Sequence, residues 1–433
     1  MTRQQGTVVL LTGNSLCNNP RAAKSAATLT RAGYRVKILG AWLDPGVKAR
    51  DLALLPEQRF EFVPVLDLTQ GDAVHRFAQR ASGKAAQFAH DVGVWESPRQ
   101  LGAVARPLLA AARNHPADLY LAHSEPGLYA ARALLGDGRQ VGVDIEDWFS
   151  EDLLPEARRH RPLRLLRSLE GDVLRHGMCS CCTSEAMADA LAETYACRRP
   201  TVIYNAFPWS DRDGLGNTAT DRVDRSLPSL YWFSQTLGPG RGIEDLLAAL
   251  PLMGAACEIH LRGAGAPGFA DWIAARLSEA WRHRVFLHDP VDNAALLPRI
   301  AEHDIGFAGE LTYCRSRGLT ATNKILHYLL GGLAVFASDT EGQQEVARLA
   351  PGAVQLFRAG DPRDLACRLD ALVASLTRRE SMRRAALQAA RDAFCWERQE
   401  AKLLDTVARA LRADRCEPVM APSRTAGFAA SVE

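Results

Sequence analysis

Residues 304–346 read DIGFAGELTYCRSRGLTATNKILHYLLGGLAVFASDTEGQQEV, and this stretch decides the fold. The apolar run Ile305–Ala308 predicts a buried strand, which is followed by a polar loop that opens at Glu310 and then by a helix. Gly331 and Gly332 end that helix, because glycine adopts the left-handed conformation that a helix C-terminus often needs.

A second buried strand, residues 334–337, follows those glycines and precedes a second helix. Thr340 and Gln343 predict a capping box at the start of this helix. The alternation of strand and helix indicates a βαβ arrangement, whose ligands bind at the carboxyl ends of the parallel strands. Glu310 falls at that edge, as does a later Asn-Lys pair, so we expect an active site there.

The composition is that of a soluble globular protein. The chain has 433 residues, of which 47% are hydrophobic and 24% charged, and its formal net charge is +2. Because this length exceeds one ordinary core, we expect two domains. The small net charge indicates no nucleic-acid partner, and no apolar run approaches the roughly 18 residues of a membrane span.

Ten cysteines are scattered through the chain, and Cys179, Cys181 and Cys182 cluster as C-x-C-C. No second Cys/His pair stands near them at zinc-like spacing. We interpret them as buried reduced thiols, with metal ligands as the alternative. Reduced thiols predict a cytoplasmic location.

The N-terminal half alternates between strands and helices. Apolar runs predict strands at 7–12, 34–39, 60–65, 118–122, 141–145, 179–183 and 201–204, with helices at 22–32, 72–114, 125–135 and 184–195. This order predicts a doubly wound domain over 1–207. One predicted strand ends in His123, and another ends in the acidic group Asp144, Glu146 and Asp147.

The C-terminal half repeats the pattern after a linker. Residues 208–228 are polar, rich in Gly and Asp, and lack periodicity, which is typical of a linker. Apolar runs then predict strands at 229–233, 258–262, 284–287, 305–308, 334–337 and 353–357. We expect a second α/β domain over 229–395, helices over about 378–412 and a disordered tail over 415–433. The space between two such domains is the natural ligand site.

Glycine-rich strand ends in the second domain suit an anion. The segment SQTLGPGRG, residues 234–242, follows the first strand and precedes a helix. Its backbone N–H groups and the helix N-terminus favour negative charge, and Arg241 adds a charged donor. The next strand ends in Gly263 and Gly265. These features favour a diphosphate, with a tight structural connection as the alternative.

The order of these motifs resembles the donor half of the family 4 (group 1) retaining glycosyltransferases. The segments that carry the resemblance are WFSQTLGPGRGIEDLL, EIHLRGAG, DIGFAGE, NKILHYLLGGLAVFAS and DTEGQQEVA. The N-terminal half is similar through NNPRAAKSAATLTRAGYRVKIL, DLYLAHSEPGLYAA, VDIEDWFSED and TSEAMADALAETYACRRPTVIYNAF. The resemblance implies an α/β GT-B fold, in which two Rossmann-like domains face each other across a cleft. It also implies that a last helix, about 396–412, crosses back to the first domain.

The resemblance assigns roles to individual residues. Glu310 matches the acid that contacts the hydroxyls and the reacting face of the donor sugar, and His123 matches a residue of the first domain near that sugar. Arg241 matches the basic residue that holds the diphosphate of a nucleotide-sugar. The implied donor-binding residues are Gln235, Gly240, Arg241, Gly263, Thr320, Asn323, Lys324 and His327. The implied acceptor-side residues are Gly13, Asn14, Ser15, Asp144 and Glu146.

Two positions depart from the family pattern. Where the family has a second Glu that bonds the ribose, this chain has His327, and an imidazole cannot accept two hydroxyls as a carboxylate does. Where an Arg commonly precedes the basic residue, this chain has Gln235. Both changes favour an alternative in which the chain is a catalytically degenerate scaffold that binds a glycan or a protein. A further alternative is a nucleotide-sugar epimerase.

Several of these residues also have a structural interpretation. Lys324 is suited to pair with a neighbouring carboxylate, and His123 to bond the backbone at a strand end. The acidic strand end at 144–147 is suited to cap helices. His327 is suited to the core, because it lies on a partly apolar helix.

The leading interpretation is a retaining hexosyltransferase. It would transfer a sugar from a nucleotide-sugar to a saccharide or lipid-linked saccharide, in surface polysaccharide or glycoconjugate biosynthesis. No DxD motif stands at a strand end, so we expect neither a metal ion nor a cofactor. Segment 155–176 is rich in Arg, with leucines interleaved. This pattern favours either a peripheral contact with the inner face of the membrane or a solvated surface helix.

Overall fold

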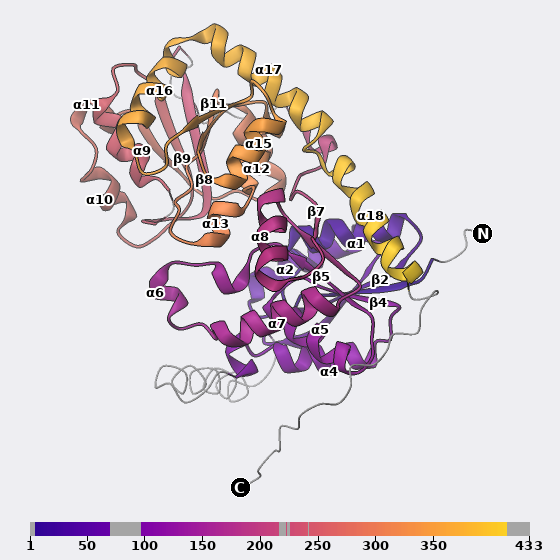
Figure 1. Ribbon diagram of the computed structural model, residues 1–433. Helices are drawn as coiled ribbons and strands as arrows, with labels where there is room; N and C mark the ends of the chain where they lie inside the picture. The colour runs from indigo at the N-terminus through magenta and orange to yellow at the C-terminus, as the bar shows by residue number, and fades with distance from the viewer. Residues whose placement is uncertain (1–4, 70–96, 216–221, 223–225, 241, 414–433) are drawn as a thin grey trace.

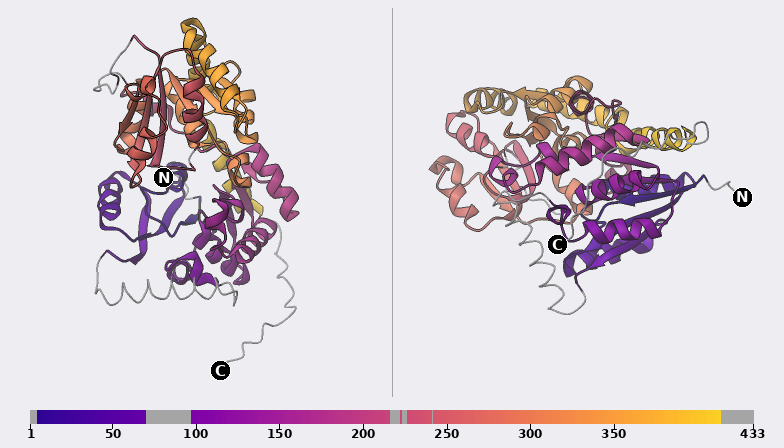
Figure 2. Two further views of the ribbon diagram at one scale, coloured as in Figure 1. Left: turned by 90° about the vertical axis from the view of Figure 1, so that its left-hand side faces the viewer. Right: turned by 60° about the horizontal axis from the view of Figure 1, so that its bottom comes forward.

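The computed structural model describes residues 5–69, 97–215, 222, 226–240 and 242–413. Two parallel sheets, each accompanied by helices, form two domains (Figure 1), which appear as separate halves in the views of Figure 2. This arrangement confirms the predicted α/β architecture of two doubly wound, Rossmann-like domains.

The first half of the chain forms a sheet in the order β3-β2-β1-β4-β5-β6-β7. Its strands are β1 (Thr7–Leu11), β2 (Arg35–Trp42), β3 (Glu61–Asp67), β4 (Leu119–Ala122), β5 (Val141–Ile145), β6 (Cys179–Cys182) and β7 (Thr201–Val202). Its helices include α1 (Pro20–Arg31), α2 (Pro45–Leu54), α4 (Ala105–Asn114), α5 (Glu125–Gly136), α6 (Pro155–Arg158), α7 (Leu163–His176) and α8 (Glu185–Tyr195). The strand order reverses between β1 and β4, and open α/β sheets bind ligands at such a switch point.

The second half forms a sheet in the order β10-β9-β8-β11-β12-β13. Its strands are β8 (Ser229–Leu237), β9 (Glu258–Gly265), β10 (Val285–His288), β11 (Ile305–Ala308), β12 (Ala334–Ser338) and β13 (Val354–Phe357). The helices that follow β8 are α9 (Glu244–Ala249), α10 (Phe269–Ala274), α11 (Glu279–Arg282), α12 (Asn293–Ala301), α13 (Arg315–Leu319), α14 (Asn323–Gly331), α15 (Glu341–Leu349), α16 (Pro362–Ala374), α17 (Leu376–Asp392) and α18 (Trp396–Ala413). The switch point here lies between β8 and β11.

Strand β1 shows why the central strands are apolar without alternation. Its residues Val8 to Leu11 are all fully buried. Successive side chains point to opposite faces of a strand, so Val9 and Leu11 pack with residues of α4 and α5, whereas Val8 and Leu10 pack with residues of α1 and α18. Burial on both faces therefore produces the continuous apolar run seen in the sequence.

Two connecting segments join the domains and pair with each other. One passes through Phe207 and the other through Cys395, and these two residues form a parallel β-bridge. The Trp396 N–H group donates to the Phe207 carbonyl at 2.9 Å. Helix α18 then lies along α1 (Figure 1), and the Trp396 indole donates to Thr28 Oγ1 at 3.0 Å. The last helix therefore packs on the first domain.

The glycine-rich strand ends differ from the prediction, because β8 and β9 are longer than their apolar runs. Strand β8 extends to Leu237, which pairs with Gly265 at the end of β9, after an irregularity between Phe233 and Thr236. Gly263 has φ +157°, and a Cβ there would lie 2.2 Å from the Ser234 carbonyl oxygen. Gly263 thus permits the close approach of two backbones within a sheet.

The predicted capping box at the start of α15 is wrong. Thr340 occupies the N-cap, but its side chain makes no cap hydrogen bond. The Gln343 amide instead donates to the Ser338 carbonyl at 3.0 Å and to Ser338 Oγ at 2.7 Å. Ser338 is 1% exposed, and a buried hydroxyl needs partners, so Gln343 bonds Ser338 rather than the helix terminus.

Segment 155–176 forms two helices rather than one. Pro162 stands at the N-cap of α7, after the short helix α6. Leu166 and Leu169 are buried in the core of the first domain, so the interleaved leucines face the protein. The exposed Arg167 pairs with Glu151 at 2.8 Å. In the described part of the chain, no helix is both long and apolar enough to cross a membrane.

Some predictions concern residues outside the described ranges. These are residues 72–96 of the helix predicted over 72–114, the part of the linker at 216–221 and 223–225, Arg241 and the tail over 415–433. The described remainder of that predicted helix is not continuous, because a 3-10 helix, Pro98–Leu101, ends at Gly102 before α4 begins. Within the predicted linker, Trp209–Arg212 form a short 3-10 helix. The described cysteines are free thiols; Cys181 and Cys182 are buried as predicted, whereas Cys179 is only half-buried.

Candidate functional site

Glu310 follows β11 at the switch point of the second sheet, and its backbone is firmly held. Its N–H group donates to Ser338 Oγ at 2.9 Å, and Ser338 Oγ donates to the Glu310 carbonyl at 3.0 Å. Glu310 as a whole is 6% exposed. Because these bonds use backbone atoms, the carboxylate does not anchor the loop and is available for other contacts. Sequence reasoning missed Ser338.

Lys324, at the start of α14, forms an ion pair with Glu310. Its Nζ lies 2.7 Å from Glu310 Oε1 and 5.7 Å from the centroid of the Trp232 ring. The structural interpretation of Lys324 therefore holds, and two predicted site residues meet. The Glu310 carboxylate, which accepts hydrogen bonds, and the Lys324 ammonium group, which lies near the N-terminus of α14, therefore lie together beside the end of β11.

The glycine-rich loop packs directly against the residue before Glu310. Gly242 has φ +86°, and a Cβ there would lie 1.9 Å from the Gly309 carbonyl oxygen. The N–H group of Gly240 donates to the Glu244 carboxylate. Gly240 and Gly242 therefore form part of a tight turn between β8 and α9. Their loop nevertheless touches the Glu310 segment through the contact of Gly242 with Gly309.

We expect Gly242→Ala to displace this loop. Alanine would clash with the Gly309 carbonyl and would adopt a left-handed conformation that L residues disfavour. The free energy of unfolding should fall by about 1–3 kcal/mol in urea titrations. Gly214→Ala is a suitable control, because a Cβ there meets nothing within 4 Å. Equal stability of both variants would contradict this packing.

The remaining donor-side predictions are not gathered around Glu310 by direct contacts. Gln235 is exposed on β8. The hydroxyl of Thr320, the C-cap residue of α13, donates to the Ser316 carbonyl at 2.7 Å. Asn323 is exposed, and its carbonyl accepts a hydrogen bond from His327.

His327 lies in an aromatic group. Its Nδ1 donates to the Asn323 carbonyl at 3.0 Å, and its ring centroid lies 3.5 Å from that of Phe207 and 5.4 Å from that of Phe233. Burial lowers the pKa of His327 to about 3, with a smaller lowering by Lys24, although the bond to Asn323 opposes the shift. The imidazole is therefore neutral, and it supplies no negative charge at this position of α14.

His123 ends β4 and points its Nδ1 at two carboxylates. This nitrogen lies 3.2 Å from Glu146 Oε1 and 3.8 Å from Asp144 Oδ2. Nε2 is buried without a hydrogen-bond partner. The His123 N–H group also donates to the Leu11 carbonyl at 3.1 Å. The structure thus joins His123 to two of the predicted acceptor-side acids.

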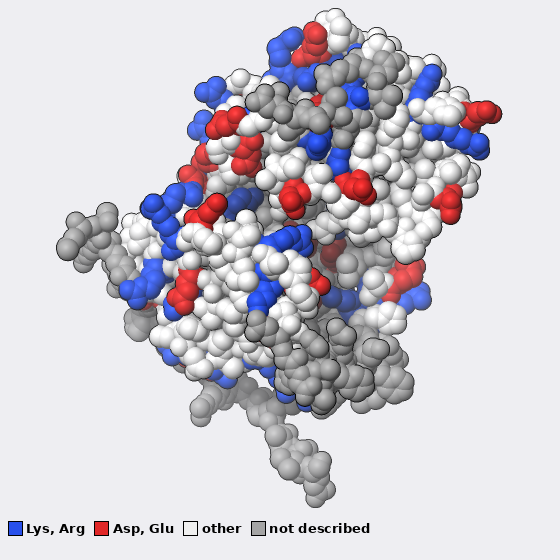
Figure 3. All heavy atoms as spheres, turned by 180° about the vertical axis from the view of Figure 1, so that it is seen from behind, with Lys and Arg blue, Asp and Glu red and all other residues white. Residues whose placement is uncertain are grey.

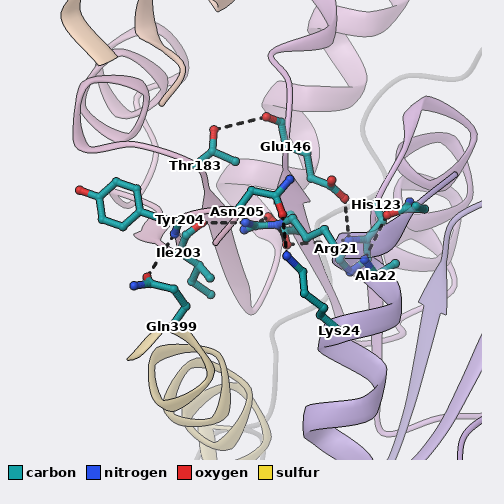
Figure 4. Close-up of polar contacts among 12 residues, drawn as sticks. Arg21, Ala22, Lys24, His123, Glu146, Thr183, Ile203, Tyr204, Asn205 and Gln399 are labelled. Atoms are coloured by element: carbon teal, nitrogen blue, oxygen red, sulfur yellow. Dashed lines mark hydrogen bonds and ion pairs between the residues drawn. The ribbon is translucent and has the colours of Figure 1, made fainter. Parts of the chain in front are cut away.

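Asp144 is the partner of a buried arginine that sequence reasoning missed. Arg21, on α1, donates to both Asp144 oxygens at 2.7 and 2.8 Å. It also donates to the Ile203 carbonyl at 2.7 Å (Figure 4). Burial raises the pKa of Asp144, but Arg21 and then His123 hold it below its usual value. Asp144 therefore has a structural role. The sequence did contain a sign that Arg21 is buried, because Arg21 lies on the same face of α1 as the buried residues Ser25 and Thr28.

Lys24 lies one turn after Arg21 and reaches the segment that joins the domains (Figure 4). Its Nζ donates to Asn205 Oδ1 at 3.1 Å and lies 4.6 Å from the Phe207 ring centroid and 4.9 Å from that of Trp396. Burial, followed by Arg21, lowers the pKa of Lys24 to about 7. Sequence reasoning missed this residue as well.

The predicted acceptor loop lines a recess in the first domain. Its volume is about 320 Å³, and it lies at the carboxyl ends of β1 and β4. The polar lining residues include Asn14, Ser124 and Glu125, and the apolar ones include Leu43, Leu101 and Phe149. Gly13 also lines the recess, whereas Ser15 is buried and Glu146 turns to His123.

Arg317, which sequence reasoning did not select, lies where the domains meet. Its Nε is 3.6 Å from Asp152 Oδ1 of the first domain. Burial lowers the pKa of Arg317, but Glu310, Asp147 and Asp152 together raise it above its ordinary value. Acids of both domains are therefore near one guanidinium group.

No family model matches the sequence, and no curated protein matches it. Solved structures do. A glycosyltransferase from Rickettsia africae ESF-5 is 12% identical, with 94% of this chain and 98% of that chain covered and a TM-score of 0.63. Alr3699/HepE from Anabaena, solved in complex with UDP, is 17% identical, with coverages of 94% and 99% and a TM-score of 0.62.

Sucrose-phosphate synthase from Thermosynechococcus elongatus is similar as well. It is 13% identical, covers 94% of this chain and 99% of its own, and has a TM-score of 0.67. Identities this low establish the fold alone. The predicted GT-B fold of two Rossmann-like domains is therefore confirmed.

Proposed function

We propose that this protein transfers a sugar from a nucleotide-sugar to a saccharide or lipid-linked saccharide. The observation that carries the proposal is the Glu310–Lys324 pair at the switch point of the second sheet, 2.7 Å apart. The HepE structures, which hold UDP or UDP-glucose, support UDP-glucose as the first donor to test. Surface polysaccharide or glycoconjugate biosynthesis is the proposed setting.

In this proposal each residue has a distinct task. Glu310 accepts hydrogen bonds from donor-sugar hydroxyls and faces the reacting carbon. Lys324, Arg241 and the N-terminus of α14 stabilise the diphosphate as it leaves. His123 contacts the sugar from the first domain. The recess beside Asn14 receives the acceptor.

Retention of configuration rests on the resemblance to family 4 alone. The acceptor hydroxyl would attack from the face that the diphosphate leaves, and a phosphate oxygen would take its proton. We propose that no metal ion takes part. The anomeric configuration of the product, read by proton NMR, tests this step.

A catalytically degenerate scaffold remains the main alternative, with an epimerase as the other. The specific observation for the scaffold is His327, whose neutral imidazole, tilted against the Phe207 ring, lacks the charge of a ribose-binding glutamate. Incubation with the donor alone detects an epimerase, because that reaction needs no acceptor.

A thermal-shift screen of nucleotide-sugars tests the proposal. A ligand that binds only the native state raises the melting temperature, by an amount that grows with its concentration over Kd. We expect one nucleotide-sugar to raise it and Glu310→Ala to reduce the shift. If neither nucleotide-sugars nor UDP or GDP raises it, the donor site is refuted.

A lipid-linked acceptor would bring the protein to the inner face of the membrane. Leu166, Leu169 and Leu174 face the core, so the outer basic face of this segment is the part suited to anionic lipid. Co-sedimentation with anionic liposomes, weakened by Arg167→Glu, is the expected result. Absence of co-sedimentation, with no change in the variant, contradicts this contact.

A further inference from the structure

We propose that Glu345 couples the arrangement of the two domains to the position of Glu310. The catalytic part of this role rests on the proposed function. Glu345 would act as a positioning residue, because it touches neither Glu310 nor its ion-pair partner Lys324 in the structure.

Glu345 belongs to the second domain but caps a helix of the first. It is 2% exposed, and its Oε1 accepts from the Glu185 N–H group at 3.0 Å while Oε2 accepts from the Ala186 N–H group at 3.1 Å. These amides open α8. The first amides of a helix lack partners within the helix and favour a negative charge. The carboxylate therefore fixes α15 to α8 across the domain boundary.

The same carboxylate is tied to the segments that join the domains. The Tyr204 hydroxyl donates to Glu345 Oε1 at 2.5 Å. Burial, and then Glu345, raise the pKa of Tyr204 above its ordinary value, so the hydroxyl keeps its proton and remains a donor. The Tyr204 ring meets Phe394 edge-on, with centroids 5.0 Å apart. Tyr204 lies just before the outgoing crossing at Phe207, and Phe394 lies next to the returning one.

The opposite face of α15 supports the donor site. Residues two positions apart point about 200° apart around a helix, and Gln343 accordingly faces away from the partners of Glu345. Its amide donates to Ser338 Oγ at 2.7 Å, and that hydroxyl bonds both the N–H group and the carbonyl of Glu310. One short helix therefore connects the domain boundary to the backbone of the proposed catalytic acid.

Two further contacts hold the loop before Lys324 between α8 and α15. Ser184, at the N-cap of α8, donates from Oγ to the Leu319 carbonyl at 2.6 Å. Gly342, in the first turn of α15, packs so closely on the Thr320 carbonyl that a Cβ would lie 2.3 Å from its oxygen. Helix α15 therefore cannot shift relative to α8 unless the loop before Lys324 moves too.

The decisive variant is Glu345→Gln. The shape is kept, but the amide nitrogen, in either of the two oxygen positions, would face a backbone N–H group that also donates, and the charge at the N-terminus of α8 is lost. We expect hydrogen exchange at the amides of Glu185 and Ala186 to accelerate by about ten- to a hundredfold. Exchange at the Glu310 amide should also accelerate, small-angle scattering should show a larger radius of gyration, and turnover should fall.

Two further variants control the experiment. Glu341→Gln removes the same charge from an exposed position of α15 and should change none of these quantities. Tyr204→Phe removes a single hydroxyl that donates to Glu345, and it should accelerate exchange at the Glu185, Ala186 and Glu310 amides to a smaller degree. If Glu345→Gln does not fold, this variant tests the coupling instead.

Hydrogen exchange at the two sites gives the results that would overturn the proposal. Unchanged exchange at Glu185 and Ala186 refutes the cap between domains. Faster exchange there with unchanged exchange at the Glu310 amide refutes the coupling. Neither readout needs substrate, so a wild-type protein without transferase activity would refute the proposed function and leave the coupling to be decided by exchange.

Discussion

Replacing Glu310 by glutamine is expected to reduce turnover by about a hundred- to a thousandfold, the usual cost of removing a group that stabilises a transition state. Glutamine keeps the shape of the side chain but loses the charge and one of two oxygen acceptors. The fold should persist, because the loop is held through backbone bonds to Ser338. Initial rates with the donor identified by thermal shift provide the measurement.

Two comparisons make that result interpretable. The melting temperature of Glu310→Gln should fall, because Lys324, whose side chain is 16% exposed, loses its carboxylate partner, but the protein should remain folded at the assay temperature. Glu380→Gln, an equivalent change at an exposed position of α17, should keep the wild-type rate. A near-native rate for Glu310→Gln would refute the assignment of this acid.

The largest effect on stability is expected for Arg21→Met. This change removes the bidentate partner of the buried Asp144 carboxylate and leaves it with His123 Nδ1 at 3.8 Å. Removal of one partner of a buried pair typically costs about 3–5 kcal/mol. Urea unfolding should show that loss at neutral pH. Arg31→Met is the matched control on the same helix. Arg31 pairs with Glu400 at 2.6 Å, but its side chain is 57% exposed, so about 0–1 kcal/mol is expected.

The difference between Arg21→Met and the wild type should depend on pH in a defined direction. In the wild type the pKa of Asp144 is lowered, so its ionisation adds stability above the ordinary value of about 3.9. That stability is lost as the pH falls through the lowered pKa. In the variant, burial without Arg21 raises the pKa of Asp144, and protonation then relieves the penalty. The two proteins should therefore converge as the medium becomes acidic, and a constant difference would contradict the ion pair.

Charge on the surface is not expected to dominate these measurements. Basic and acidic side chains are interspersed on the face shown in Figure 3, in keeping with a formal net charge of +2. Salt should also change the effect of Arg21→Met on the free energy of unfolding only a little. The reason is that Arg21 and Asp144 are buried, and buried pairs are screened much less than exposed ones.

Local patterns were sufficient for much of the fold. The apolar run Ile305–Ala308 became β11 with its predicted bounds, and Gly332 ends α14 in the left-handed conformation. Such patterns report burial and backbone conformation, which are properties of neighbouring residues in the chain. They failed at β8, because the pairing of Leu237 with Gly265 joins segments whose apolar runs had already ended.

The sequence by itself determined two α/β domains, the strand end that carries Glu310 and the helix that carries Lys324. Only the tertiary structure decided which buried polar groups meet. Arg21 and Asp144 are separated by 123 positions, and Glu345 reaches a helix of the other domain. The physical reason is that a buried charge requires a partner, but its identity depends on which strands and helices become neighbours. That choice is made by the topology of the whole chain, so no local pattern contains it.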